Sequence, residues 1–180
     1  MTTNPVNLSG RELRATVEVP PMPRSASRPS RSSSGRPDGL PAEPEALFVY
    51  GTLQFPDVLR ALIGRVPEHE AASAAGWRAA ALPGRVYPGL VPAAATVRGV
   101  LLSGLALAEW RILDAFEGPG YDREPVLLLD GRSAWVYTYP LEAEVGDDDW
   151  SSAAFADRHL PAYVERCAVW RARHGRERPR

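Results

Sequence analysis

The stretch LFVYGTLQFPDVLRALIG, residues 47–64, joins an apolar strand directly to a short amphipathic helix. Residues 46–50 predict a short and mostly buried strand, because they are almost all apolar. Pro56 stands where a helix begins and Gly64 where it ends. A helix this short is not stable alone, so it is expected to pack on the sheet to which the strand belongs.

The turn between these two elements, from Tyr50 to Leu53, contains a glycine directly after the strand. A tight turn from strand to helix leaves several backbone N–H groups unpaired and directed at one point, which suits an anionic ligand. A plain connection has the same sequence pattern. Both interpretations stay open from this stretch alone.

Downstream, the pattern alternates between strands and helices, as expected for an α+β fold. Glycine and proline divide residues 74–104 into short β segments, which is typical of a meander or a curved sheet. Residues 105–118 have the apolar spacing of a helix with Gly118 as its stop. Two β-prone runs over residues 124–139 predict a hairpin that turns at Asp130-Gly131.

The two ends of the chain differ from this folded part. Residues 1–44 are rich in proline, serine and arginine, and such a segment buries too little apolar surface to fold, so we predict a disordered arm. A last helix is expected over about residues 151–173, with Pro161 either bending it or dividing it in two. The expected organisation is one domain over residues 45–175, followed by a disordered tail over 176–180.

Composition narrows the class of function. Twenty-one arginines, with no lysine, nearly balance 22 acidic residues, so the chain lacks the basic field of a nucleic-acid-binding protein and the polybasic patch of a membrane-bound one. No apolar run approaches about 18 residues, and the N-terminus lacks the apolar segment of a signal peptide, so we expect a cytoplasmic protein with a small-molecule partner. Cys167 is the only cysteine, and no metal-binding motif is present, so no metal site is predicted.

Two acids, Asp114 and Glu117, lie near the end of the helix predicted over residues 105–118. The C-terminal end of a helix carries the negative pole of its macrodipole and disfavours an acid. A carboxylate held there beside another acid is expected to have a raised pKa, as a general base working near neutrality requires. Alternatively, both acids are solvated on the surface. Combined with the turn amides, one such acid suits a small substrate that carries a carboxylate and needs one proton moved.

Five motifs occur in order over one domain, namely FVYGTL at 48–53, YPGLVP at 87–92, VRGVLL at 97–102, LDAFEGPGYDR at 113–123 and AWVYTY at 134–139. In these residues the chain resembles the γ-glutamylcyclotransferase-like family, also called AIG2-like. The resemblance covers nearly everything from residue 46 to about 172. It implies a small mixed β-barrel flanked by helices, which agrees with the α+β pattern.

The resemblance also implies a reaction. The backbone amides of Tyr50, Gly51, Thr52 and Leu53 would hold the α-carboxylate of a γ-glutamyl group. Glu117 would take a proton from the substrate α-amine, which attacks the γ-carbonyl, and would return a proton to the leaving amine. The products would be 5-oxoproline and a free amine or amino acid. Because both reacting groups belong to one molecule, no cofactor is expected.

The resemblance places further side chains at the pocket. Tyr121 and Arg123 follow the acid in a Y-x-R pattern, and Arg85 and Tyr87 are additional candidates. An ion pair with a nearby aspartate explains Arg123 equally well. The chain has YGTL rather than the YGSN form of the glutathione-pathway branch, so it is nearer the branch that includes γ-glutamylamine cyclotransferases. That difference leaves the amine unidentified.

Two other functions are compatible with the same residues. The pocket of a binding module would hold a γ-glutamyl group or another small acid without turning it over, although such a pocket has no use for an acid in an unfavourable position. A related acyl-transfer or hydrolytic enzyme would remove a γ-glutamyl group in a biosynthetic pathway. Only the product distinguishes that enzyme from a cyclotransferase.

Overall fold

The computed structural model describes residues 45–139 and 145–176. The predicted arm over residues 1–44 and positions 177–180 of the predicted tail lie outside the described residues, whereas Arg176 belongs to the last helix. The elements are, in chain order and with η for a 3₁₀ helix, β1 (Leu47–Val49), η1 (Thr52–Gln54), α1 (Pro56–Ile63), β2 (Glu68–Ala81), β3 (Pro88–Ser103), α2 (Leu107–Glu117), η2 (Gly118–Gly120), β4 (Asp122–Leu127), β5 (Ser133–Thr138), α3 (Ser152–Arg158) and α4 (Leu160–Arg176).

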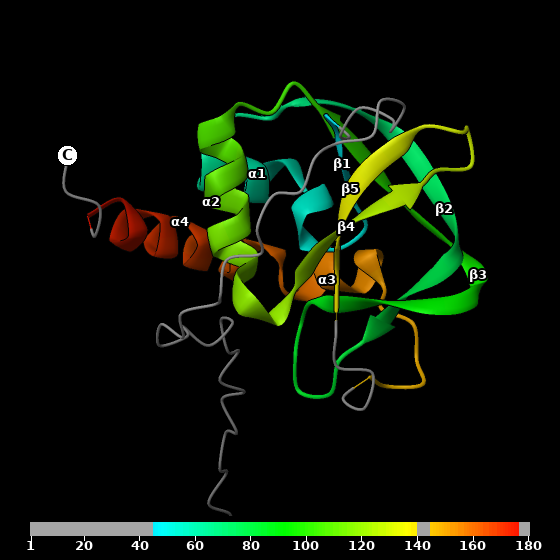
Figure 1. Ribbon diagram of the computed structural model, residues 1–180. Helices are drawn as coiled ribbons and strands as arrows, with labels where there is room; N and C mark the ends of the chain where they lie inside the picture. Colours follow the sequence, from blue (N-terminus) through cyan, green and yellow to red (C-terminus); the bar gives the residue numbers. More distant parts are fainter. Residues whose placement is uncertain (1–44, 140–144, 177–180) are drawn as a thin grey trace, which may run out of the picture.

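The strands form one mixed sheet in the order β2-β3-β1-β5-β4. β1 runs antiparallel to β3, with Leu47 opposite Leu102, and parallel to β5, with Leu47 opposite Trp135. The sheet curls on itself, and beyond β4 the Leu129 N–H donates a 2.9 Å hydrogen bond to the Ser73 carbonyl of β2. Figure 1 shows α1, α2 and α4 together on one side of this curled sheet. The expected α+β fold, a small mixed barrel flanked by helices, is confirmed.

β2 and β3 are longer than the sequence pattern suggested. Instead of several short segments, they form one continuous antiparallel hairpin that is paired from Glu68 opposite Ser103 to Ala81 opposite Pro88. The pairing is irregular beside Gly76, whose φ is 85°. A bulge of this kind bends a strand and increases its twist without ending it. The glycines that predicted breaks therefore lie within a curved, unbroken hairpin.

The helices at the two ends of the domain begin and end for local reasons. α1 starts at Pro56, and its end is capped by Gly64, which has a φ of 81° and donates its N–H to the Arg60 carbonyl at 3.0 Å. The predicted last helix is divided in two, with the break at His159 between α3 and α4. Pro161 lies in the first turn of α4, where a missing N–H breaks no helical hydrogen bond.

β1 is buried on both faces. Leu47 and Val49 belong to the apolar cluster that the helices cover. Phe48 and Tyr50, which alternate with them, belong to a second cluster enclosed by the barrel strands. Burying a large apolar side chain stabilises a fold by about 1.5–3 kcal/mol. β1 therefore gives the turn that follows it a firmly packed base.

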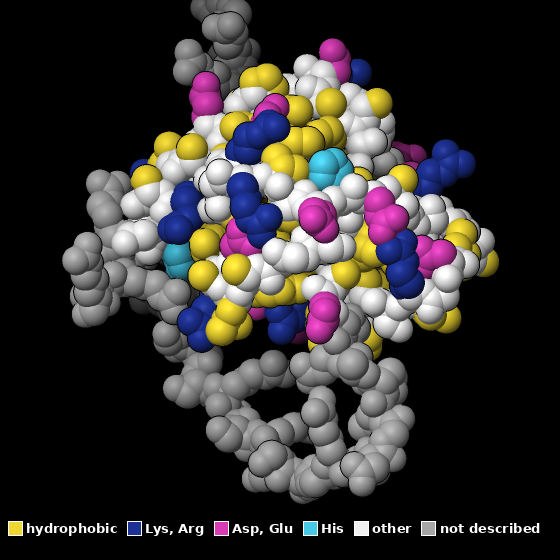
Figure 2. All heavy atoms as spheres, turned by 90° about the horizontal axis from the view of Figure 1, so that it is seen from above, with side chains coloured by type: hydrophobic (Ala, Val, Ile, Leu, Met, Phe, Trp, Pro, Cys, Tyr) yellow, Lys and Arg dark blue, Asp and Glu magenta, His cyan; other side chains and the backbone are white. Residues whose placement is uncertain are grey.

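The outer surface has a mixed charge on the side seen in Figure 2, where arginines and acidic side chains are interspersed. That face carries no extended basic patch. Among the described residues, no helix is both long enough and apolar enough to cross a membrane.

Candidate functional site

The turn after β1 is shaped by a close approach of two chain segments. A Cβ atom added to Gly51 would lie 2.9 Å from Cγ of Pro88, the first residue of β3. Non-bonded carbon atoms normally approach only to about 3.5 Å, so a larger residue at position 51 would have to displace the Pro88 ring. The glycine of the turn is therefore explained by packing against β3.

The same turn exposes backbone donors. η1 closes with the Gln54 N–H bonded to the Gly51 carbonyl at 3.1 Å and the Phe55 N–H bonded to the Thr52 carbonyl at 3.3 Å. Within the described part of the chain, the amides of Gly51, Thr52 and Leu53 donate no hydrogen bond, as expected for the first N–H groups of a helical turn. The Gln54 side chain donates to the carbonyls of Tyr50 and Gly51 at 2.9 and 3.0 Å. Its amide thus satisfies the acceptors of the turn and leaves the donors available.

A narrow cavity of about 20 Å³, partly open to solvent, lies beside this turn. Five segments far apart in the sequence build its wall: the turn after β1, the start of β3, the end of α2, the residue after η2, and α4. The lining residues are Tyr50, Gly51, Thr52, Tyr87, Pro88, Phe116, Glu117, Tyr121 and Tyr163. Glu117 is the only acid among them.

Glu117 is the last residue of α2. Burial of its carboxyl raises the pKa of Glu117 to about 8, and no positive charge or hydrogen bond of the described residues offsets this effect. The expected direction of the shift is confirmed, but its cause is different. Desolvation produces it, rather than the helix end or the neighbouring acid Asp114. A buried carboxyl that holds its proton near neutrality can act as either an acid or a base.

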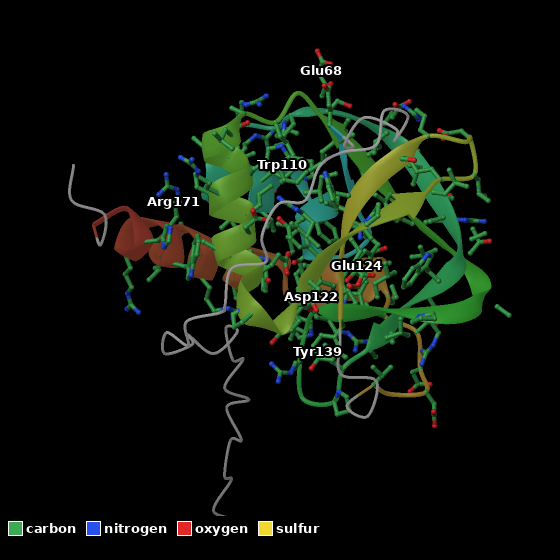
Figure 3. The ribbon with its side chains drawn as sticks, in the orientation of Figure 1. Glu68, Trp110, Asp122, Glu124, Tyr139 and Arg171 are labelled. Atoms are coloured by element: carbon green, nitrogen blue, oxygen red, sulfur yellow. The ribbon has the colours of Figure 1, made fainter. Side chains whose placement is uncertain are left out.

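Asp114 lies outside the cavity. Its side chain is 42% exposed and is paired with Arg123 at 3.1 Å, and it accepts a 2.8 Å hydrogen bond from the Tyr137 hydroxyl. The Arg123 guanidinium also packs over the rings of Trp110 and Trp135, at 5.1 and 5.2 Å from their centroids. Trp110 projects from α2 (Figure 3). Of the two interpretations of Arg123, the structure shows the ion pair, and Arg123 is not among the residues that line the cavity.

Tyr87 and Tyr121 do line the cavity, as the sequence suggested. Their ring centroids are 6.5 Å apart. The Tyr121 hydroxyl donates a 2.7 Å hydrogen bond to the Pro88 carbonyl, which fixes the ring against β3. Arg85 does not belong to the lining but donates to the Tyr87 hydroxyl. It therefore lies one residue removed from the cavity.

The side chains of Tyr50 and Leu53 have structural roles. The Tyr50 hydroxyl donates to the Tyr137 carbonyl at 2.9 Å and accepts from the Leu90 N–H at 3.0 Å, which ties β5 to β3. Leu53 is 3% exposed and belongs to the cluster under the helices. Leu53 is not among the residues that line the cavity, whereas Tyr50, Gly51 and Thr52 of the same turn are.

Three lining residues were not among the sequence candidates, namely Pro88, Phe116 and Tyr163. Tyr163 belongs to α4 and is buried. Only the docking of α4 against the turn brings its hydroxyl to 3.3 Å from Oγ1 of Thr52. The sequence carries no signal for that contact.

A second, wider and more open groove has a volume of about 340 Å³ and includes Arg78, Arg98 and Asp149 in its wall. Among the predicted site residues it contains only Tyr50. Arg78 donates to the Gly146 carbonyl at 2.9 Å and so holds the neighbouring loop. Over residues 45–139 and 145–176, no three His, Cys, Asp or Glu side chains are grouped so that they could hold a metal ion.

Comparisons with known proteins point to one family. The family model described as "Gamma-glutamyl cyclotransferase, AIG2-like" matches residues 47–153. AIG2-like protein D of Arabidopsis thaliana is 39% identical over 128 residues, which cover 67% of this chain and 84% of that protein. AIG2-like protein C of the same plant is 44% identical over 84 residues, which cover 46% of this chain and 49% of that protein, about half its length.

A solved structure agrees at the level of the fold. The solution structure of an Arabidopsis thaliana protein superposes with a TM-score of 0.51 and 27% sequence identity, over 76% of this chain and 95% of that one.

Proposed function

Because the chain belongs to the γ-glutamyl cyclotransferase, AIG2-like family, we propose that it converts a γ-glutamyl amine or γ-glutamyl amino acid to 5-oxoproline and the free amine. One observation carries this proposal. A single carboxyl with a pKa raised to about 8, that of Glu117, shares a small cavity with the donor-rich turn after β1.

The turn supplies the binding half of the site. The amides of Gly51, Thr52 and Leu53 make no hydrogen bond within the described part of the chain, so they are available to the α-carboxylate of the substrate. Hydrogen bonds to a charged acceptor are stronger than those between neutral groups. A carboxylate held there orients the rest of the γ-glutamyl group within the cavity.

Glu117 supplies the proton transfer. In its ionised form it accepts a proton from the α-amine, whose nitrogen attacks the γ-carbonyl carbon and closes a five-membered lactam ring. The bond between the γ-carbon and the leaving nitrogen then breaks, and Glu117 returns the proton to that nitrogen. No water is consumed and no net proton is released. Holding the α-amine and the γ-carbonyl of one molecule in the orientation needed for ring closure accounts for a large part of the rate enhancement.

The cyclisation is tested by incubating the protein with a panel of γ-glutamyl amines and γ-glutamyl amino acids and measuring 5-oxoproline and glutamate. We expect 5-oxoproline from at least one compound, because the α-amine is the nucleophile. The same compound acetylated on its α-amine is the control and should give neither product. Release of glutamate would instead indicate hydrolysis. Binding without any product would indicate a binding module of the same fold.

The raised pKa of Glu117 predicts a steep pH dependence. The group acts as a base only when ionised, and with a pKa of about 8 its ionised fraction falls as the pH decreases from 8. We expect kcat/KM at pH 6 to be about 50-fold lower than at pH 8. The substrate α-amine titrates in the same region, so the pKa of Glu117 is measured directly by carboxyl NMR, with Glu117→Gln identifying its signal. A midpoint below pH 5, as for an ordinary glutamate, would contradict the prediction.

A further inference from the structure

A pair of buried hydroxyl groups, those of Thr52 and Tyr163, lies in the wall of the cavity. The Thr52 and Tyr163 hydroxyl oxygens are 3.3 Å apart. Both residues line the cavity together with Glu117, and their exposed fractions are 6% and 5%. Thr52 belongs to the turn after β1, whereas Tyr163 comes from α4, so the pair joins the donor-rich turn to the last helix.

One of the two O–H donors of this pair is not used in the bond between them. Each hydroxyl group can donate one hydrogen bond and accept two, but one donated bond is enough to join them. Within the described residues, neither oxygen makes another hydrogen bond. Burial raises the pKa of Tyr163, so its hydroxyl keeps its proton at neutral pH. Buried donors nearly always have an acceptor. The unused O–H group therefore needs one, and a ligand in the cavity can supply it.

A half-buried arginine packs against the ring of Tyr163. The Arg166 guanidinium carbon is 5.3 Å from the centroid of the Tyr163 ring. Nε and Nη2 of Arg166 are buried and have no hydrogen-bond partner in the described part of the chain. Buried N–H donors without an acceptor are unfavourable, and the guanidinium carries a positive charge. An anion bound near Tyr163 would therefore be attracted to this end of the cavity.

From these contacts we propose that the Tyr163 hydroxyl is a second anchor for the carboxylate held by the amides of Gly51, Thr52 and Leu53, with Arg166 as a positioning residue that supplies charge behind the ring. This inference rests on the proposed function and deepens it. The α-carboxylate is common to all γ-glutamyl compounds. Tyr163 therefore sets the affinity for the glutamyl half of the substrate and leaves the choice of amine to other residues.

The binding test compares two probes that differ in the carboxylate. 5-Oxoproline carries it, and 2-pyrrolidinone is the same lactam ring without it. We expect Tyr163→Phe to weaken binding of 5-oxoproline by about tenfold or more and to leave 2-pyrrolidinone unchanged. Arg166→Gln should act in the same direction. Tyr137→Phe is the matched control, because that hydroxyl bonds to Asp114 outside the cavity, and it should change the binding of neither probe.

Three outcomes would overturn the inference. One is equal weakening of both probes by Tyr163→Phe, which would mean that the hydroxyl pair only ties α4 to the turn and maintains the shape of the cavity. The second is unchanged binding of 5-oxoproline by Tyr163→Phe, and the third is a wild-type protein that does not bind it at millimolar concentration. Thermal unfolding of each variant, monitored by circular dichroism, shows whether the fold is retained in the binding assay.

Kinetics separates this inference from the proposed function. If the protein is a cyclotransferase, Tyr163→Phe should raise KM by a similar factor for every active substrate and change kcat little. A normal KM in an active Tyr163→Phe variant would refute the inference alone. Selective loss of 5-oxoproline affinity in a protein that releases no product would refute the cyclotransferase proposal alone.

Discussion

Exchanging Glu117 for glutamine is expected to lower kcat/KM for release of 5-oxoproline by about 100- to 10,000-fold. Glutamine has nearly the same shape but can neither accept the α-amine proton nor return it to the leaving nitrogen. No other acid lines the cavity, so no described residue there can replace the lost base. The measurement is the initial rate of 5-oxoproline release from the most active compound of the panel, at pH 8.

The matched control is Asp114→Asn, which removes the acid three residues earlier on the same helix. Asp114 is paired with Arg123 outside the cavity, so its loss should change kcat/KM by less than about threefold. Because the raised pKa shows that burial disfavours the charged form of Glu117, the neutral glutamine is not expected to destabilise the fold. Retention of more than a tenth of the activity by a folded Glu117→Gln protein would refute the assigned base.

The second large effect is on stability. Replacing Gly99 with alanine is expected to lower the free energy of unfolding by about 3 kcal/mol. A Cβ atom at position 99 would lie 2.3 Å from the Val49 carbonyl oxygen and 2.9 Å from the Phe48 ring. The nearer atom belongs to the backbone of β1, which is buried on both faces, so the clash cannot be relieved by rotating a side chain. Urea unfolding measures the change.

Gly120→Ala is the matched control for Gly99→Ala. A Cβ atom there would meet nothing within 4 Å, and the φ of Gly120 is not positive. We expect a change within about 0.5 kcal/mol. If Gly99→Ala unfolds at the same urea concentration as wild type, the close approach of β3 to β1 would not contribute to stability as described.

Elements with strong local signals were predictable from the sequence. The strand-turn-helix unit at residues 47–64 carries its own boundaries, because Pro56 and Gly64 each fit one end of α1. The turn at Asp130-Gly131 was equally clear, and Gly131 has the positive φ that its position requires. In these places, the local conformational preference and the tertiary fold agree.

The hairpin of β2 and β3 was not predictable in the same way. Gly76, Gly89 and Gly99 suggested interruptions, yet each lies within the paired hairpin. A Cβ atom at Gly89 would lie 2.8 Å from Cβ of Tyr139, so this glycine permits close packing. Whether a glycine ends a strand or lets another chain segment approach depends on tertiary neighbours, which a single sequence does not show.

The residues of the candidate site also fall into two groups, those with a local sequence signal and those whose place depends on tertiary contacts. The turn after β1 and Glu117 came from local pattern and family resemblance, and the structure brings them to one cavity. Arg123 resembled a pocket residue in its motif, but two tryptophan rings and Asp114 hold it elsewhere. Tyr163 was not among the sequence candidates, because its contact with Thr52 depends on how α4 docks.

The position of Tyr163 also determines when, during synthesis of the chain, the cavity can be completed. Thr52 and Tyr163 are 111 residues apart, and contacts of such long sequence separation form slowly and late in folding. Because chains are made from the N-terminus onward, the turn and Glu117 leave the ribosome before α4. A nascent or prematurely terminated chain without α4 would carry the base and the turn amides but lack the wall that closes the cavity. Maturation of the cavity is therefore tied to docking of the last helix.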